Sequence, residues 1–352
     1  MTVLLILGGL VLLVGGAELL VRGATRLASA AGIPSLVIGL TVVAFGTSAP
    51  EMAVSVGATL QGDSDIALGN VVGSNIFNVL FILGASALVA PLVVDRRMVR
   101  EQVPLMVAVS GLLIVLALDG SVGRIEGLVL FGGVLAFTTF LIRRGRREST
   151  AAAASAPPME TIAGTGGVVR SGVYVAAGLA LLVAGAHGLV TGAQELARAA
   201  GLSELVIGLT VVAAGTSLPE LATSIVATLR GERDIAVGNV VGSNIFNILA
   251  ILGVSAMVAS DGVTISPGAL TFDLPVMTAV AVACLPVFIG GRIDRWEGGL
   301  FLAFYVAYAI YLGLDATNHG ALDEFRAAMI WFVLPLTVLT LVVTASRAFR
   351  SG

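Results

Sequence analysis

The sequence predicts an all-α polytopic membrane protein, built from two inverted five-helix repeats (5+5) plus one additional C-terminal transmembrane helix. Composition is the first reason: of 352 residues, 57% are hydrophobic and 12% charged, and the mean hydropathy is +1.03. Ordinary soluble domains are about one-quarter charged. A long internal repeat and an alternating distribution of arginines are the other two reasons.

Apolar runs long enough to cross a bilayer recur along the chain, separated by short turn-rich or charged breaks. A spanning helix needs about 20 mostly apolar residues. The runs predict five helices, then five more, then a last one. Their ranges are 3–30, 34–60, 66–90, 99–118, 125–142, 172–199, 203–229, 235–259, 270–290, 296–314 and 327–346.

The repeat relates residues 36–84 to residues 205–253, which are identical at 37 of 49 positions at a constant offset of 169. The likeness reaches AELLVRGA and AHGLVTGA upstream, and RIEG and RWEG downstream, so the repeated unit holds five helices. Because that number is odd, the second copy enters the membrane from the opposite side, as in inverted-repeat transporters.

These boundaries predict four parts of the chain. Residues 1–142 form the first five-helix repeat, and residues 143–171, rich in Arg, Ala, Ser, Pro and Gly, form a cytoplasmic linker. Residues 172–314 form the second, inverted repeat. Residues 315–352 hold the eleventh helix and the C-terminal tail.

Orientation follows from arginine, because the sequence has no lysine and cytoplasmic loops collect basic residues. With the N-terminus outside, 16 of the 19 arginines fall in cytoplasmic loops and three outside. The sequence therefore predicts a protein integral to the cell (inner or plasma) membrane, with its N-terminus outside and its C-terminus cytoplasmic.

Both repeats interrupt an apolar helix with the same polar motif, GTSAPE at 46–51 and GTSLPE at 215–220. Pro50 lacks the N–H that would bond the carbonyl of Gly46, so backbone oxygens are freed within the span. A charge at the centre of a membrane helix costs roughly 2.5 to 3.5 kcal/mol on insertion scales. Glu51 and Glu220 are thus expected near the midplane, where the two halves meet and transporters bind their substrates.

The side chains around the two glutamates offer oxygen. Hydroxyls come from Thr47, Ser48, Thr216 and Ser217, and Ser74, Asn78, Ser243 and Asn247 lie four residues apart in pairs on the following helices. All-oxygen sets suit hard cations such as calcium or sodium. Asn75 and Asn244 leave two readings open, a contact between helices or support for the ion ligands.

The duplicated GTSxPE and GNVVGSNIFN motifs make the sequence similar to prokaryotic members of the sodium/calcium exchanger family, within the cation/calcium antiporter superfamily. That resemblance implies exchange of sodium for calcium by alternating access, with the first and sixth helices sliding across the rest. It implies that Glu51 and Glu220 bind both ions. It adds the backbone carbonyls of Ala44 and Ala213 to the ligands, beside Thr47, Ser48, Thr216, Ser217, Ser74, Asn78, Ser243 and Asn247.

One departure concerns Asn247, where several members of the family carry aspartate. The site then holds two carboxylates rather than three, which leaves the sodium stoichiometry and the driving ion open. A proton-coupled calcium or cation antiporter is therefore the alternative.

Other classes of protein fit less well. The sequence has no paired nucleophile and base, no metal-ligating histidine cluster and no nucleotide loop, so we expect no enzyme. We expect no cofactor, since calcium and sodium are transported ligands. The net charge of −3 indicates no nucleic-acid partner. We expect the lipid bilayer to surround the protein, and the sequence leaves the oligomeric state open.

Overall fold

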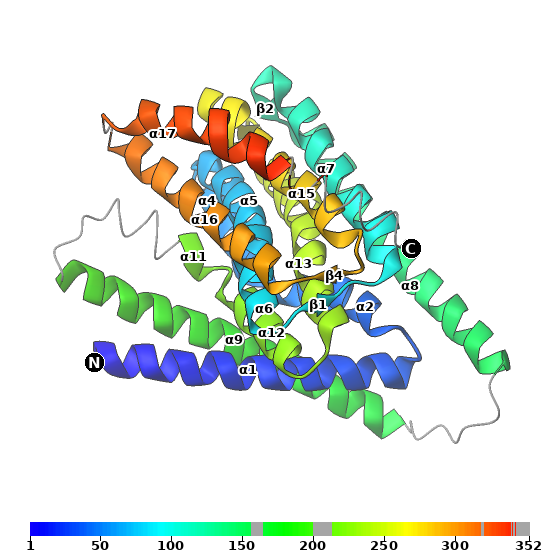
Figure 1. The fold of residues 1–352 in the computed structure, drawn as a ribbon. Coiled ribbons are helices and arrows are strands. Elements are labelled where there is room, and N and C mark those ends of the chain that lie inside the picture. The colour runs from blue at the N-terminus through cyan, green and yellow to red at the C-terminus, as the bar shows by residue number, and fades with distance from the viewer. Residues whose placement is uncertain (156–164, 200–212, 318–319, 339, 341, 343–352) are drawn as a thin grey trace.

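A computed structural model describes residues 1–155, 165–199, 213–317 and 320–338, together with 340 and 342. Figure 1 shows a helical molecule in which two long N-terminal helices of the halves lie side by side, and the remaining helices gather on one face of that pair. The first half holds helices α1 (Thr2–Ala31), α2 (Ser35–Ile38), α3 (Ala44–Thr47), α4 (Ala49–Leu60), α5 (Ser64–Phe77), α6 (Gly84–Val89), α7 (Val103–Leu116) and α8 (Arg124–Ser155).

The second half repeats much of this order. Its helices are α9 (Thr165–Ala199), α11 (Ala213–Gly215), α12 (Leu218–Leu229), α13 (Arg233–Phe246), α14 (Gly253–Val258), α15 (Leu274–Phe288) and α16 (Arg295–Ala316), and α17 (Leu322–Ala328) follows. Short π-helical or 3₁₀ turns continue several of them: η1 (Gly39–Val43), η2 (Asn78–Leu83), η3 (Met98–Gln102), η4 (Ala117–Asp119), η6 (Asn247–Leu252), η7 (Ala269–Asp273) and η8 (Met329–Val333).

Eight helices within the described residues are long and apolar enough to cross a membrane, and the pair Ser35–Thr47 and Ala49–Leu60, bent by 45°, makes a ninth if counted as one span. The all-helical prediction is thus confirmed at this level. Residues 203–212 of the predicted seventh helix, and 339, 341 and 343–346 of the eleventh, lie outside the described residues. The inverted relation of the halves stays a prediction.

Helix ends differ from the expected ones on either side of the predicted linker. α8 continues to Ser155 rather than ending near residue 142, and α9 begins at Thr165 rather than near 172. Ala and Arg, which are common in residues 143–155, are strong helix formers, so the helix extends beyond its apolar part.

Glycines bring α1 and α9 into close contact along their length. A Cβ at Gly16 would lie 2.8 Å from the carbonyl oxygen of Gly178, and one at Gly9 would lie 2.7 Å from that of Gly185. Side chains cannot be added at such distances, so the backbones touch, as small residues allow in membrane helices. The glycines recur every seven residues on both helices, at 9, 16 and 23 and at 178, 185 and 192.

The structure adds four two-residue strands that the sequence did not predict. β1 (Leu92–Val93) pairs antiparallel with β4 (Arg292–Ile293), and β2 (Ser121–Val122) pairs with β3 (Val263–Thr264). At an offset of 171, β1 corresponds to β3 and β2 to β4. Each strand therefore pairs not with its own counterpart but with the other strand of the opposite half. The β1–β4 pair and the β2–β3 pair are equivalent contacts.

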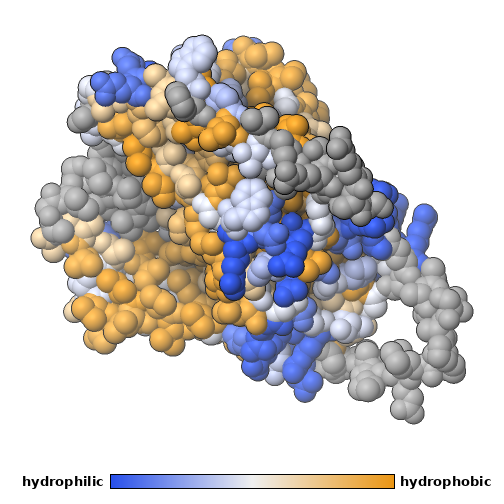
Figure 2. All heavy atoms as spheres, viewed as in Figure 1, coloured by the Kyte–Doolittle hydropathy of each residue, from blue (hydrophilic) through white to orange (hydrophobic). Residues whose placement is uncertain are grey.

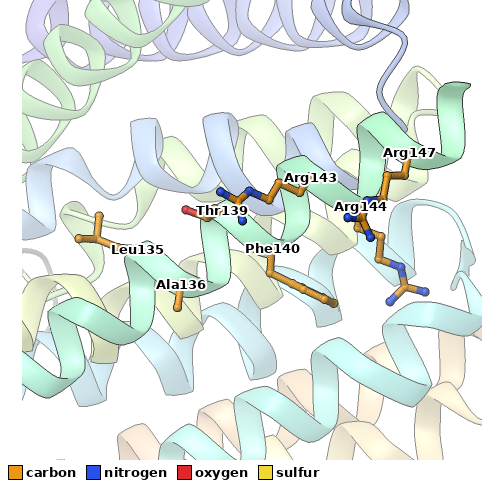
Figure 3. Close-up of a pocket in the computed structure, with 7 residues that line it drawn as sticks. All are labelled: Leu135, Ala136, Thr139, Phe140, Arg143, Arg144 and Arg147. Carbon is orange, nitrogen blue, oxygen red and sulfur yellow. The ribbon is translucent and has the colours of Figure 1, made fainter.

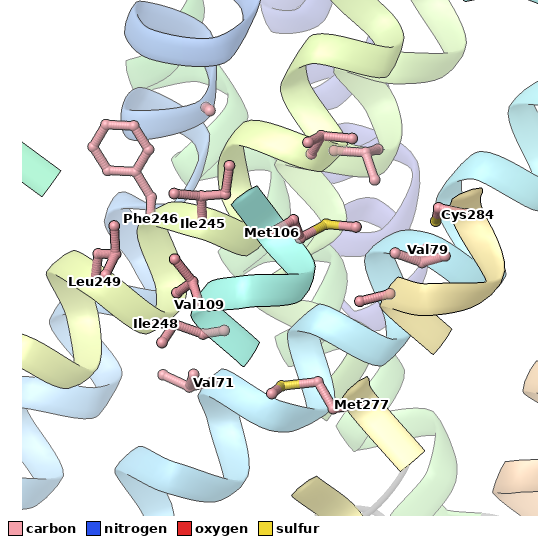
Figure 4. Packing of buried hydrophobic residues seen from close by; sticks show 14 of the residues in the cluster. Val71, Val79, Met106, Val109, Ile245, Phe246, Ile248, Leu249, Met277 and Cys284 are labelled. Atoms are coloured by element: carbon pink, nitrogen blue, oxygen red, sulfur yellow. The ribbon is translucent and has the colours of Figure 1, made fainter. Parts of the chain in front are cut away.

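The apolar core lies around α5, α7, α13 and α15. Figure 4 shows Val71, Met106, Val109, Ile245 and Met277 from these helices packed together. α5 and α13, which carry the GNVVGSNIFN motifs, are central to this core. Their polar residues Ser74, Asn75, Ser243 and Asn244 are therefore removed from water.

The outer surface suits a lipid environment. In the view of Figure 2, apolar residues cover much of the surface, while hydrophilic residues gather in the central, lower and right-hand parts, with a smaller group at the upper left. Large exposed apolar side chains include Leu4, Val11, Val129 and Leu135. Contiguous exposed apolar surface of this kind is rare on soluble monomers.

Candidate cation site

The predicted helix break is present in both halves. α3 stops at Ser48, whose φ and ψ of −80° and 8° leave the helical region, and α4 resumes with Pro50 in its first turn. Ser217 has nearly the same angles, −89° and 9°, just before α12. Proline is favoured in the first turn of a helix, where its missing N–H has no partner to lose. The break thus places a glutamate in the first turn of each resumed helix.

Glu51 and Glu220 are both buried, each with 1% of its surface exposed. Ser217 Oγ donates to Glu51 Oε1 at 2.9 Å, and Ser48 Oγ donates to Glu220 Oε1 at 3.0 Å. Each carboxylate thus takes its donor from the other half. The second oxygens, Glu51 Oε2 and Glu220 Oε2, are buried and have no hydrogen-bond partner.

Ser243 joins this group from α13. Its hydroxyl lies 3.1 Å from Ser48 Oγ. A serine has one proton to donate and a carboxylate only accepts, so Ser48 donates to Glu220 while Ser243 donates to Ser48. Ser74, the repeat mate of Ser243 on α5, is buried with its hydroxyl unpartnered.

Four asparagines connect the two halves behind the serines. Asn75 Nδ2 donates to the backbone oxygen of Asn244 and Asn244 Nδ2 to that of Asn75, both at 3.2 Å. These bonds fix both amides, because a carbonyl accepts only from the NH₂ end. Asn75 Oδ1 then receives a bond from Asn247 Nδ2 at 2.9 Å, and Asn244 Oδ1 one from Asn78 Nδ2 at 3.0 Å.

As a result, Asn78 and Asn247 use their NH₂ groups and keep their oxygens free. Asn78 Oδ1 and Asn247 Oδ1 are both buried without a partner. The π-helical turns η2 and η6 begin at these two residues, and such turns are frequent at functional sites. Asn75 and Asn244 therefore join the two halves, and they orient the amides of Asn78 and Asn247. Their support for ion ligands stays a prediction.

Thr47 and Thr216 face two asparagines that the sequence reasoning missed. Asn239 Nδ2 donates to the Glu220 carbonyl at 3.3 Å and to Ser224 Oγ at 3.1 Å, and its Oδ1 receives Thr47 Oγ1 at 3.1 Å. Asn70 makes the matching bonds to the Glu51 carbonyl, to Ser55 and, at 3.4 Å, to Thr216. Their signal in the sequence was the first Asn of the duplicated GNVVGSNIFN motif.

Two alanines, Ala44 and Ala213, were predicted to bind the ion through their backbone carbonyls, and the structure gives a carbonyl contact for the first of them. The Ala44 carbonyl accepts the Ser48 N–H at 3.1 Å, which leaves one of its two lone pairs. Ala213 begins α11, next to residues outside the described ranges. Among the described residues, no group of three or more His, Cys, Asp or Glu side chains could hold a metal ion.

A small cavity of about 90 Å³ reaches Ser48 and is lined by Phe45, Ala49, Met52, Phe246, Ala250 and Ile251. Phe45 and Phe246 meet edge to face above it, with ring centroids 5.8 Å apart. A larger hollow lies elsewhere, along α8, where Figure 3 shows Arg143, Arg144 and Arg147 beside Phe140. The cavity beside Ser48 is therefore walled by apolar and aromatic side chains.

Comparison with known proteins identifies the class. A sequence model of the family described as "Sodium/calcium exchanger protein" matches residues 1–143 and 170–314. The chain belongs to the sodium/calcium exchanger family, and it is an integral membrane protein.

Individual relatives cover nearly the whole protein. The chain is 40% identical over 318 residues to the "Putative antiporter CaxA" of Alkalimonas amylolytica, covering 87% of this chain and 97% of that one. It is 35% identical over 349 residues to the "Sodium/calcium exchanger MaX1" of Methanosarcina acetivorans, covering 88% and 97%. A solved structure of the sodium-calcium exchanger NCX_Mj, soaked with 10 mM Na⁺ and zero Ca²⁺, superposes with a TM-score of 0.76 at 31% identity, covering 87% and 98%.

Proposed function

We propose that this protein is a secondary active antiporter that exchanges sodium for calcium across the membrane by alternating access, with the ions bound at the midplane between Glu51 and Glu220. The observation that carries the proposal is the set of buried acceptor oxygens without donors: Glu51 Oε2, Glu220 Oε2, Ser74 Oγ, Asn78 Oδ1 and Asn247 Oδ1. Unpaired buried oxygens each cost about 1 to 3 kcal/mol, and a bound cation would satisfy them.

The charges support a cation as the ligand. No lysine, arginine or histidine forms an ion pair with either glutamate among the described residues. One calcium ion or two sodium ions would neutralise two carboxylates, which makes the two ions direct competitors. The oxygen-only chemistry of the set suits both.

The arrangement of the halves supports alternating access. Reciprocal bonds between Ser48 and Glu220 and between Ser217 and Glu51 join the two repeats at the glutamates, which supports a site between the halves. α1 and α9 touch through glycine backbones, and we expect this pair to slide as one unit over the core. The relatives CaxA and MaX1, named as antiporter and exchanger, agree with this proposal.

The orientation remains part of the proposal, with the N-terminus outside and the C-terminus cytoplasmic, as the arginine distribution predicts. The four-part division into residues 1–142, 143–171, 172–314 and 315–352 likewise stays a prediction.

The test is uptake of radioactive calcium by proteoliposomes loaded with sodium, compared with vesicles that carry only a pH gradient. We expect uptake that needs internal sodium and is independent of the pH gradient. Uptake that follows the pH gradient and ignores sodium would instead support the proton-coupled antiporter. An absence of uptake in both would contradict antiport of calcium.

A further inference from the structure

Thr47 has one hydroxyl proton and several acceptors within reach, and the Glu220 carboxylate is one of them. Its Oγ1 lies 3.1 Å from the Val43 carbonyl, 3.4 Å from the Ala44 carbonyl and 3.1 Å from Asn239 Oδ1. The first two are backbone oxygens of its own helix, and the third belongs to the other half. A threonine in a helix ordinarily returns its proton to the carbonyl three or four residues earlier.

Asn239 is held so that its oxygen must face Thr47. Its NH₂ group donates to the Glu220 carbonyl at 3.3 Å and to Ser224 Oγ at 3.1 Å. Turning the amide over would set its oxygen against the Glu220 carbonyl, two acceptors in contact. Asn239 has no exposed surface, so water cannot replace either bond.

The acceptor that takes the Thr47 proton decides whether the Ala44 carbonyl can bind a cation. It already accepts the Ser48 N–H at 3.1 Å, so one lone pair remains. A Thr47 proton placed on that lone pair would leave no room there for a cation. A Thr47 proton placed on Asn239 leaves the lone pair available at the helix break.

We infer that Asn239, and its repeat mate Asn70, are positioning residues for cation binding: each amide oxygen draws the hydroxyl proton of the threonine in the opposite half away from the helix break, which keeps a backbone carbonyl free for the ion. On the partly buried Asn70, Nδ2 likewise donates to the Glu51 carbonyl at 3.2 Å, and Oδ1 accepts from Thr216 at 3.4 Å. The role rests on the proposed cation exchange and adds a determinant of affinity to it.

The test is a double-mutant cycle on the full-length protein in proteoliposomes, with sodium-dependent calcium uptake as the readout. We expect Asn239→Leu to raise the KM for calcium about tenfold, the effect of one lost polar contact, while kcat changes less than about threefold. In a Thr47→Val background there is no hydroxyl proton to steer, so we expect Asn239→Leu to change the KM by less than about twofold.

A merely structural role for Asn239 would give the same fold-change in both backgrounds, and that result would overturn the inference. So would an unchanged KM in Asn239→Leu. Should that variant fail to fold, Asn70→Leu with Thr216→Val repeats the cycle in the other half. Gln61→Leu, at an exposed amide, is the control and should leave the KM unchanged.

The wild-type protein in the same assay separates a failure of the asparagine role from a failure of the proposed cation exchange. If it exchanges calcium and the cycle is additive, only the role of the asparagines is wrong. If it neither transports calcium nor binds calcium or sodium, the proposed function is wrong and the inference falls with it.

Discussion

Replacing Glu220 by glutamine probes the cation site with one atom changed. In the structure, Glu220 Oε1 is occupied by the Ser48 hydroxyl, and Oε2 is buried and unpartnered. If glutamine keeps its oxygen on Ser48, its NH₂ group points where the cation would sit. If it turns over, the oxygen faces the cation, but one of the two charges that balance calcium is gone.

The expected cost follows from burial. Removing one partner of a buried charge pair costs about 3 to 5 kcal/mol. At about 1.4 kcal/mol for each tenfold change, calcium affinity should fall by roughly two to nearly four orders of magnitude. Glu51→Gln should behave alike, because Glu51 has the same pattern, with Ser217 on Oε1 and Oε2 free.

The assay is calorimetric titration of the detergent-purified protein with calcium chloride, followed by sodium-dependent uptake in proteoliposomes. Glu324→Gln, which makes the same chemical change at an exposed carboxylate of α17, is the matched control and should bind calcium as the wild type does. Calcium binding by Glu220→Gln within about threefold of wild type would refute a site built on this carboxylate.

Two further variants test the supporting structure. In Asn247→Asp, a carboxylate oxygen replaces the NH₂ group that donates to Asn75 Oδ1 at 2.9 Å. We therefore expect the free energy of unfolding without ions to fall by about 1 to 3 kcal/mol, and calcium to restore more stability than it adds to the wild type. Thermal unfolding with and without calcium chloride measures both effects. Equal melting temperatures, together with an unchanged sodium dependence of uptake, would show that this position sets neither packing nor coupling. In Gly16→Val, the new Cβ would lie 2.8 Å from the Gly178 carbonyl oxygen, so α1 and α9 must separate. We expect calcium uptake to fall at least tenfold while calcium binding persists. Full uptake would exclude close contact of these helices during transport.

Much of the fold could be predicted because membrane helices have a simple signal. Apolar length alone located nine of the eleven predicted spans among the described residues, with the bent pair counted as one span. Gly46 with Pro50 correctly indicated a break, which the structure places at Ser48. The Ala-rich segment after residue 142 was harder, because its composition suits both a linker and a helix, and it extends α8 to Ser155. The two-residue strands have too few residues to show an alternating pattern.

The candidate site was predicted in its residue types but not in its bonding. Glutamates and hydroxyls stand out in an apolar helix, whereas the role of an amide depends on which way it faces. Asn239 is oriented by the backbone carbonyl of Glu220 on the preceding helix, and Asn75 by that of Asn244 in the other half. No local pattern encodes those contacts, and only the packed halves reveal them.

The reciprocal contacts between the halves have a consequence for assembly. Each half carries a buried carboxylate that accepts a hydrogen bond from a serine hydroxyl of the other half. Each half also carries an asparagine amide that donates to a backbone carbonyl of the other half. A single half on its own would have to bury these groups unsatisfied. Its natural complement would be a second copy of itself, since the two halves share their polar motifs at almost every position. The covalent link between the repeats therefore keeps together two halves that depend on each other's polar groups, so each half can acquire its own substitutions without losing its partner.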